Sequence, residues 1–171
     1  MDILMLGHSL IEFYDWESRY PRHNVKNLGV AGETVEGLLD RTGAIISKFP
    51  KADLVFIMTG ANNLAMDDYD FLSPYERIIM RLKSAYPDAT IYVLSILPVL
   101  FDWISPGSIE KLNDAIKGLA RKYEAEYIDL YDEFTERGKA KLEYIMDDGV
   151  HLSSEGYEAW GKVLDGIINE E

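Results

Sequence analysis

The sequence predicts an α/β protein built as a three-layer α/β/α sandwich, in which helices cover both faces of a parallel sheet. Short apolar runs rich in β-branched residues alternate along the chain with stretches whose apolar residues keep helical spacing. One run, residues 54–59 (LVFIMT), is almost wholly apolar, as expected of a strand buried on both faces. Strands and helices that alternate in this way form parallel sheets through right-handed crossover connections.

Five strands and four main helices are expected. The strands are residues 3–6, 25–28, 54–59, 90–96 and 126–130. Thr34 is expected to cap the first helix, because its oxygen can accept from the N–H groups of the first turn. The segment SPYE at residues 73–76 has the form of a capping box with proline at the first helical position, and predicts the start of the second helix. Ser108 is expected to cap the third helix, and Ser153 or Ser154 the fourth.

Length and composition limit the class of protein. The 171 residues are expected to form a single domain over residues 1–171, and the apolar fraction of 47% is that of a folded chain. The chain has no cysteine, which excludes disulfides, thiolate metal sites and cysteine nucleophiles, and we expect neither a metal nor another cofactor. A net charge of −13 argues against nucleic-acid and anionic membrane partners. A cytoplasmic location is expected.

Four polar segments fall at the ends of predicted strands or before the last helix. They are residues 7–10 (GHSL), 27–37 (NLGVAGETVEG), 59–64 (TGANNL) and 146–157 (MDDGVHLSSEGY). Because open parallel sheets bind ligands at the carboxyl ends of their strands, these segments are expected to meet at one edge. Taken singly, each has an ordinary structural explanation, since serine caps helices and glycine and asparagine favour turns.

The histidines are the candidate catalytic bases, and there are only three: His8, His23 and His151. Asp148 precedes His151 by three residues, so one turn can bring the carboxylate to the imidazole, fix its tautomer and stabilise its charged form. His8 is adjacent to Ser9, but neighbouring residues that leave a strand point to opposite sides. We therefore expect His151, rather than His8, to face the hydroxyl of Ser9.

Together the four segments resemble the SGNH hydrolases, also called GDSL-type esterases or lipases. The first block of that family, Gly-Asp-Ser, is similar to Gly-His-Ser at residues 7–9, and its glycine block is similar to NLGVAG with Gly29 at the glycine position. Its Gly-x-Asn-Asp block resembles residues 60–63, and its Asp-x-x-His block resembles residues 148–151. The resemblance covers almost the whole chain and implies a flavodoxin-like fold with a five-stranded parallel sheet.

The resemblance implies a role for each matching residue. Ser9 would be the nucleophile, His151 its base and Asp148 the acid that orients the base. The backbone N–H groups of Ser9 and Gly29, with the side chain of Asn62, would form the oxyanion hole. The implied activity is hydrolysis of a carboxylic ester through an acyl-enzyme on the serine.

The chain departs from the family pattern at two positions. His8 replaces the aspartate of the first block and Asn63 replaces the aspartate of the third. Both are expected to shape the loops around the serine and to lie near the substrate. Asp147 is the other candidate for the acid, although the Asp-x-x-His spacing favours Asp148.

The segment at residues 96–106 (ILPVLFDWISP) is long, apolar and aromatic for a loop. Its Leu100, Phe101 and Trp103, with residues 13, 16 and 66, are expected to form the wall of a small-molecule pocket that takes an ester with a short acyl group. Alternatively, part of this segment packs under the neighbouring helix, or residues 97–106 form a contact between copies of the chain. In the rival functional interpretation, the altered blocks mark a catalytically weakened ligand-binding or interaction module on the same fold. A flavin or nucleotide binder is disfavoured, since the first loop has no glycine-rich phosphate cradle.

Overall fold

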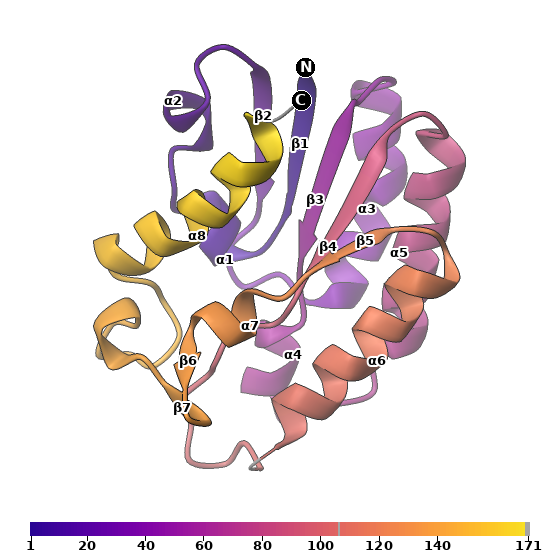
Figure 1. Cartoon of the computed structure of the whole chain (residues 1–171). Coiled ribbons are helices and arrows are strands. Elements are labelled where there is room, and N and C mark those ends of the chain that lie inside the picture. The colour runs from indigo at the N-terminus through magenta and orange to yellow at the C-terminus, as the bar shows by residue number, and fades with distance from the viewer. Residues whose placement is uncertain (106, 170–171) are drawn as a thin grey trace.

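Five parallel strands form a sheet of order β2-β1-β3-β4-β5 in the computed structural model, which describes residues 1–105 and 107–169 (Figure 1). The strands are β1 (Asp2–Gly7), β2 (Asn24–Gly29), β3 (Leu54–Met58), β4 (Thr90–Leu94) and β5 (Glu126–Ile128). The longer helices are α3 (Val35–Lys48), α5 (Leu72–Ala85), α6 (Ser108–Lys122) and α8 (Ser154–Ile168). The short ones are α1 (Ser9–Glu12), α2 (Trp16–Arg19), α4 (Ala61–Ala65) and α7 (Leu130–Glu133). A small antiparallel ribbon, β6 (Thr135–Glu136) with β7 (Lys139–Ala140), and a 3₁₀ turn, η1 (Leu142–Tyr144), precede α8.

Helices cover both faces of the sheet, which confirms the predicted three-layer α/β arrangement. Helices α3, α5 and α6 pack on one face, and α1, α2 and α8 on the other (Figure 1). Alternate residues of each strand point into the two resulting cores, so that in β1 Leu4 and Leu6 belong to the first and Ile3 and Met5 to the second. Every residue of β3 is buried, as its continuous apolar sequence predicts for a central strand.

All five predicted strands are present, although the last two are shorter than expected. β4 ends at Leu94 and β5 at Ile128, each two residues before its apolar run ends. The N–H of Ser95 still bonds the carbonyl of Ile128, and the hydroxyl of Ser95 accepts from the N–H of Tyr131. The apolar residues beyond these strands therefore lie in buried connections rather than in the sheet.

Two of the four predicted helix caps are correct. The hydroxyl of Thr34 accepts from the N–H of Gly37 at the start of α3, and that of Ser153 accepts from the N–H of Gly156 at the start of α8. The predicted capping box at Ser73 is wrong, because Phe71, two residues earlier, occupies the cap position of α5 and makes no side-chain cap bond. The buried side chain of Phe71 fixes the entry of the chain there.

The predicted cap at Ser108 is also wrong. Gly107, in the left-handed region at φ 76°, occupies the cap position of α6, and Ser108 is the first helical residue. The hydroxyl of Ser108 donates to the carbonyl of Ser105 instead.

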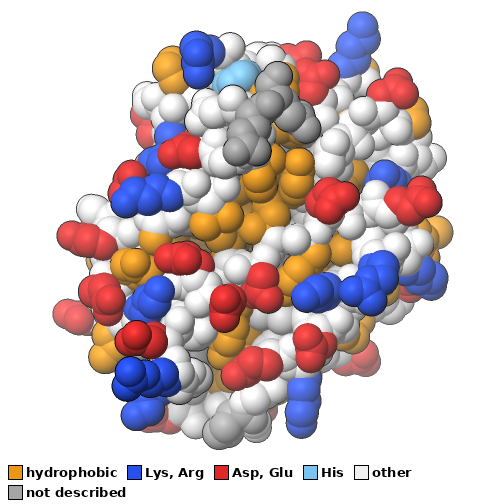
Figure 2. All heavy atoms as spheres, viewed as in Figure 1, with side chains coloured by type: hydrophobic (Ala, Val, Ile, Leu, Met, Phe, Trp, Pro, Cys, Tyr) orange, Lys and Arg blue, Asp and Glu red, His pale blue; other side chains and the backbone are white. Residues whose placement is uncertain are grey.

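The surface agrees with the strongly acidic composition. Acidic side chains are spread over the face shown in Figure 2, with basic ones between them. Within residues 1–105 and 107–169, no helix has the length and hydropathy needed to cross a bilayer. The single domain predicted for residues 1–171 includes Pro106, Glu170 and Glu171, which lie outside the described residues.

Candidate active site

Ser9 lies at the carboxyl end of β1, where the chain turns directly from the strand into α1. The turn requires Gly7, because a Cβ atom at that position would clash with the backbone carbonyl of Met58 on the neighbouring strand β3. His8 caps α1 through its Nδ1 atom, which accepts from the N–H of Leu10 at 3.4 Å. Because His8 fills the cap position, the hydroxyl of Ser9 is not used to cap the helix.

The structure brings Ser9, His151 and Asp148 together. Nε2 of His151 lies 3.1 Å from Oγ of Ser9, and Nδ1 of the same ring lies 2.6 Å from Oδ2 of Asp148. An ionised carboxylate can only accept, so Nδ1 carries the proton and Nε2 is the acceptor for the serine hydroxyl. The ring of Phe13 contacts the imidazole at a centroid distance of 5.4 Å.

Asp148 is held as a carboxylate by its hydrogen bonds. Partial burial raises its pKa, but the bonds from the His151 ring and from the backbone N–H groups of Val150 and His151 outweigh burial and lower the pKa to about 2. The two backbone bonds reach Oδ1 at 3.0 and 2.9 Å, which leaves Oδ2 for the imidazole. The carboxylate is therefore charged and oriented at neutral pH, as the partner of a general base must be.

His8 is buried beside this arrangement, with 2% of its surface exposed. Burial, and after it the proximity of His151, lowers the pKa of His8 to about 4. The ring is consequently neutral at neutral pH, and its one hydrogen bond in the described structure is to the backbone of Leu10. His8 thus supports the start of α1 and does not bond the serine hydroxyl.

Asn63 is also buried, and its amide bonds three residues. Oδ1 accepts from the N–H of Val35 at 2.9 Å, while Nδ2 donates to Glu36 at 2.9 Å and to Asp68 at 2.8 Å. An aspartate at this position could bond the N–H of Val35, but it would face two carboxylates without a proton to offer. The asparagine therefore suits the two acidic neighbours that this chain has.

The N–H of the predicted oxyanion donor Gly29 is already hydrogen-bonded within the chain. It donates to Oδ1 of Asn27 at 3.1 Å, and Gly29 does not line the cavity that contains Ser9. Gly32 does line that cavity, with φ at 77°, and its N–H has no hydrogen-bond partner within the described part of the chain. Among the described residues, Gly32 rather than Gly29 therefore presents an unpaired N–H at the cavity.

The other two expected donors lie at the cavity. The N–H of Ser9 has no partner among the residues that the structure describes. Asn62 lines the cavity, and its Nδ2 atom donates one bond, at 2.9 Å, to the carbonyl of Glu33. An amide nitrogen carries two hydrogens, so Asn62 retains one for a ligand.

The cavity has a volume of about 340 Å³ and mostly apolar walls. Its lining residues are Ser9, Phe13, Ala31, Gly32, Asn62, Ala65, Phe101, Asp148, Val150 and His151. Of the residues expected to contact substrate, Phe101 lines the cavity, whereas His8, Asn63, Leu100 and Trp103 do not. The ring of Trp103 stacks on that of Phe101 at 4.5 Å, and the N–H of Leu100 bonds the carbonyl of Gly149.

Residues 13, 16 and 66 were also expected in the pocket wall, and they differ in position. Phe13 lines the cavity, but Trp16 is fully buried in the core and Met66 is exposed beyond the lining residue Ala65. Sequence reasoning missed the small residues Ala31 and Ala65, whose type gives no signal of a pocket.

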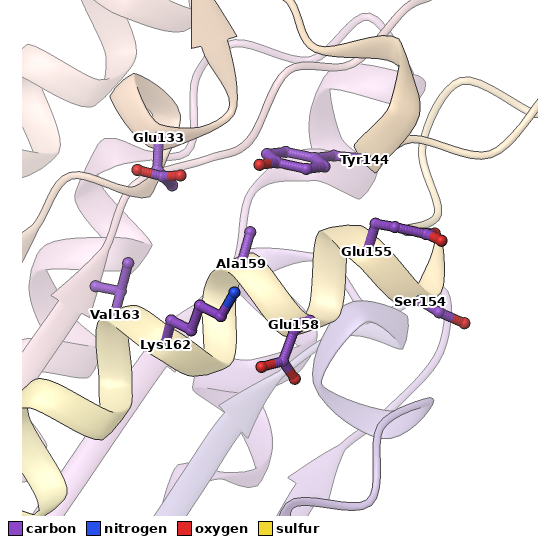
Figure 3. Close-up of a pocket in the computed structure, with 8 residues that line it drawn as sticks. All are labelled: Glu133, Tyr144, Ser154, Glu155, Glu158, Ala159, Lys162 and Val163. Carbon is purple, nitrogen blue, oxygen red and sulfur yellow. The ribbon is translucent and has the colours of Figure 1, made fainter.

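A larger cavity of about 670 Å³ lies between α8 and the segment that precedes it (Figure 3). Glu133 and Tyr144 lie opposite α8, and Ala159 and Val163 of that helix point toward them. Its described lining contains no histidine, so no imidazole base accompanies the hydroxyl of Ser154. The smaller cavity is the one that holds a serine, a histidine and a carboxylate in hydrogen-bond contact. In the described residues, no group of three or more His, Cys, Asp or Glu side chains is arranged to hold a metal ion.

Comparison with known proteins gives consistent matches. A model of the GDSL-like lipase/acylhydrolase family matches residues 11–159, a stretch that begins just after Ser9. The platelet-activating factor acetylhydrolase IB subunit alpha2 of Rattus norvegicus is 25% identical over 178 residues, which cover 98% of this chain and 76% of the rat protein.

Solved structures agree with the fold. A Streptococcus pneumonia structure described as a platelet activating factor has a TM-score of 0.85 and 29% identity, and the match covers 96% of this chain and 82% of that one. A GDSL-like lipase from Bacteroides thetaiotaomicron has a TM-score of 0.79 and 21% identity, with 99% of this chain and 88% of the other covered.

Proposed function

The chain belongs to the GDSL-like lipase/acylhydrolase family and is an ester-cleaving hydrolase, and we propose that it acts through an acyl-enzyme formed on Ser9. One observation carries the proposal: Oγ of Ser9 lies 3.1 Å from Nε2 of His151, whose other nitrogen bonds Asp148 at 2.6 Å. A hydroxyl, an imidazole base and an orienting carboxylate in this order form an activated nucleophile.

In the first half of the reaction, Oγ of Ser9 attacks the carbonyl carbon of the ester and its proton passes to Nε2 of His151. Asp148 stabilises the imidazolium that forms. The negative oxygen of the tetrahedral intermediate is bound by the N–H groups of Ser9 and Gly32 and by the Asn62 amide, all neutral donors. The carbon–oxygen bond to the alcohol then breaks, the alcohol takes the proton from His151, and the acyl group remains on the serine.

In the second half, a water molecule attacks the acyl carbon and gives a proton to Nε2 of His151. The same donors bind the oxyanion, the bond to Oγ of Ser9 breaks, and the proton returns to that oxygen. A carboxylic acid leaves and the free serine is restored. No redox step and no co-reactant other than water is needed.

The proposed substrate is an ester with a short acyl group and an apolar portion near the ester bond. The cavity of about 340 Å³ is small, which supports a short acyl group, as do the relatives named as acetylhydrolases. Exposed hydrophobic side chains lie around the lining residues: Phe13 is itself a lining residue, Met66 follows Ala65, and Trp103 stacks on Phe101. An apolar group on the substrate would cover this surface.

Turnover of p-nitrophenyl acetate by the purified chain and by two serine variants tests the proposal. Ser9→Ala removes the nucleophile, so kcat/KM should fall at least about a thousandfold. Ser154→Ala changes a serine in the larger cavity and should leave turnover unchanged. Equal turnover by the wild type and Ser9→Ala would contradict the proposed nucleophile. Slower hydrolysis of octanoate than of acetate esters is expected from the small cavity.

The cytoplasmic location stays a prediction of the sequence. The same holds for a contact between copies of the chain through residues 97–106, of which Pro106 lies outside the described residues.

A further inference from the structure

A partly buried ion pair lies at the loop between β2 and α3. Arg41 of α3 donates from Nε and Nη2 to the two carboxylate oxygens of Glu33, with Nη2 at 2.7 Å from Oε2. The side chains are 24% and 8% exposed, so solvent screens the pair less than it screens a surface ion pair. Glu33 directly follows Gly32, the proposed oxyanion donor.

The same guanidinium also bonds the backbone at the ends of two strands. Nη2 of Arg41 reaches the carbonyl oxygen of Leu28 at 2.7 Å and that of Gly7 at 3.4 Å. Leu28 is near the end of β2, and Gly7 ends β1 two residues before Ser9. The carbonyl of Glu33 in turn accepts the amide N–H of Asn62. One side chain is thus linked to the segments that carry all three donors.

We propose that Arg41, acting through Glu33, is a positioning residue that holds the oxyanion donors Ser9, Gly32 and Asn62 in their relative places. This inference rests on the proposed function. The donors come from three separate segments after β1, β2 and β3, and a small displacement of any one weakens the binding of the oxyanion. A planar guanidinium that bonds a carboxylate at two points and carbonyl oxygens besides is suited to fixing such a junction.

Gly37 in the first turn of α3 supports this assignment. A Cβ atom there would come within 2.9 Å of Cγ of Glu33. Glycine weakens the interior of a helix, but here it leaves the space in which the Glu33 side chain lies against α3 on its way to Arg41.

The test is the acylation step of Arg41→Gln, measured with p-nitrophenyl acetate in single-turnover experiments with enzyme in excess. These experiments separate the acylation rate constant from the substrate dissociation constant. The oxyanion forms only in the transition state, so the rate constant should fall about 10- to 100-fold while the dissociation constant changes less than about twofold. A purely structural role would lower Tm and leave the rate constant of the folded protein unchanged.

Arg19→Gln is the matched control. Arg19 also bonds a carboxylate at two points, through Nε and Nη2 to Asp165, and its side chain is 14% exposed, but it lies outside the active site. This control should lose stability and keep the wild-type acylation rate.

An acylation rate of Arg41→Gln within twofold of the wild type, or an equal loss in Arg19→Gln, would overturn the inference. If Arg41→Gln does not fold, Glu33→Gln decides, because it keeps the size of the side chain and removes its charge. A decrease in the acylation rate constant of Glu33→Gln, smaller than the decrease expected for Arg41→Gln, supports the inference. An unchanged acylation rate constant overturns it. Absence of turnover in the wild type would instead contradict the proposed function.

Discussion

His8 is the residue that makes the first loop of this chain differ from the Gly-Asp-Ser pattern of its family. Nδ1 of His8 accepts the N–H of Leu10, a bond that an aspartate could also accept. The difference is electrostatic, because a neutral imidazole rather than a carboxylate is buried near His151. The low pKa of His8 has a consequence for stability in acid.

We predict that His8 makes the protein less stable as the pH falls from about 6.5 to 4. The pKa of His8 is about 4 when folded and 6.5 when unfolded, so in this window the unfolded chain takes up a proton that the folded chain does not. The stabilisation is fully present above pH 6.5 and is lost progressively below it, by about 3 kcal/mol in total. Urea unfolding of the wild type and His8→Asn at pH 7 and pH 4.5 measures it. Asparagine can still cap α1, and the unfolding free energy of this variant should decrease less between pH 7 and pH 4.5 than that of the wild type. Equal decreases in the two proteins would contradict the prediction.

Asn63 is the second departure from the family, and restoring the aspartate should harm this chain. Asn63→Asp places a carboxylate, 1% exposed at this position, against Glu36 and Asp68. We expect a loss of roughly 2–4 kcal/mol in unfolding free energy at pH 7. The burial and the like charges raise the folded pKa of the new carboxyl, so the deficit should shrink as the pH falls. Chemical denaturation at pH 7 and pH 5 checks both statements, and a variant as stable as the wild type at pH 7 would refute them.

Much of the site was predictable at this scale, because spacing along one short turn restricts where side chains can lie. The interval from Asp148 to His151 predicts their contact, and the structure has it. The choice between Gly29 and Gly32 was not predictable in the same way. It depends on whether the side chain of Asn27 bonds the N–H of Gly29, a contact that the two-residue spacing allows but does not require.

At the scale of elements, the spacing of β1 and β3 determines where Ser9 leaves the sheet. A Cβ atom on Gly7 would clash with the Met58 carbonyl and approach Cγ1 of Ile11 to 2.9 Å. We predict that Gly7→Ala lowers the unfolding free energy by about 1–3 kcal/mol and also slows acylation, because the strands must separate at the serine.

Gly118→Ala is the control for that prediction. Gly118 lies within α6, and an added Cβ meets no atom within 4 Å. Alanine there should raise the unfolding free energy by about 0.5–1 kcal/mol and leave acylation unchanged. Urea denaturation of both variants measures the difference, and a Gly7→Ala protein as stable as the wild type would contradict the account of this turn.

The elements themselves were predicted well where periodicity was long, and poorly where a boundary depended on tertiary contacts. The five strands and four longer helices appear at their predicted positions. The start of α5 was misplaced because the buried Phe71, not Ser73, sets it. The apolar loop after β4 was expected to line the pocket as a unit, but only Phe101 among its three named side chains does so.

At the scale of the whole molecule, the parallel sheet explains why residues so far apart in the sequence share one site. Ser9, Gly32 and Asn62 follow three adjacent strands, and the segment with Asp148 and His151 precedes α8, which packs on the same sheet. The alternation of strands and helices was sufficient to predict that these segments meet at the carboxyl edge of the sheet. The net charge of −13, with acidic side chains spread over the viewed face, is that of a solvated surface around a mostly apolar pocket.

The central claim is that Ser9 is a nucleophile activated by His151 and not by its neighbour His8. Labelling by a fluorophosphonate tests it most directly, with the modified residue located by mass spectrometry of peptides. We predict a single adduct on Ser9, formed at least about a hundredfold more slowly in His151→Ala and still readily in His8→Asn. An ester-hydrolysing protein without an adduct on Ser9, or one whose labelling needs His8 and not His151, would contradict the claim.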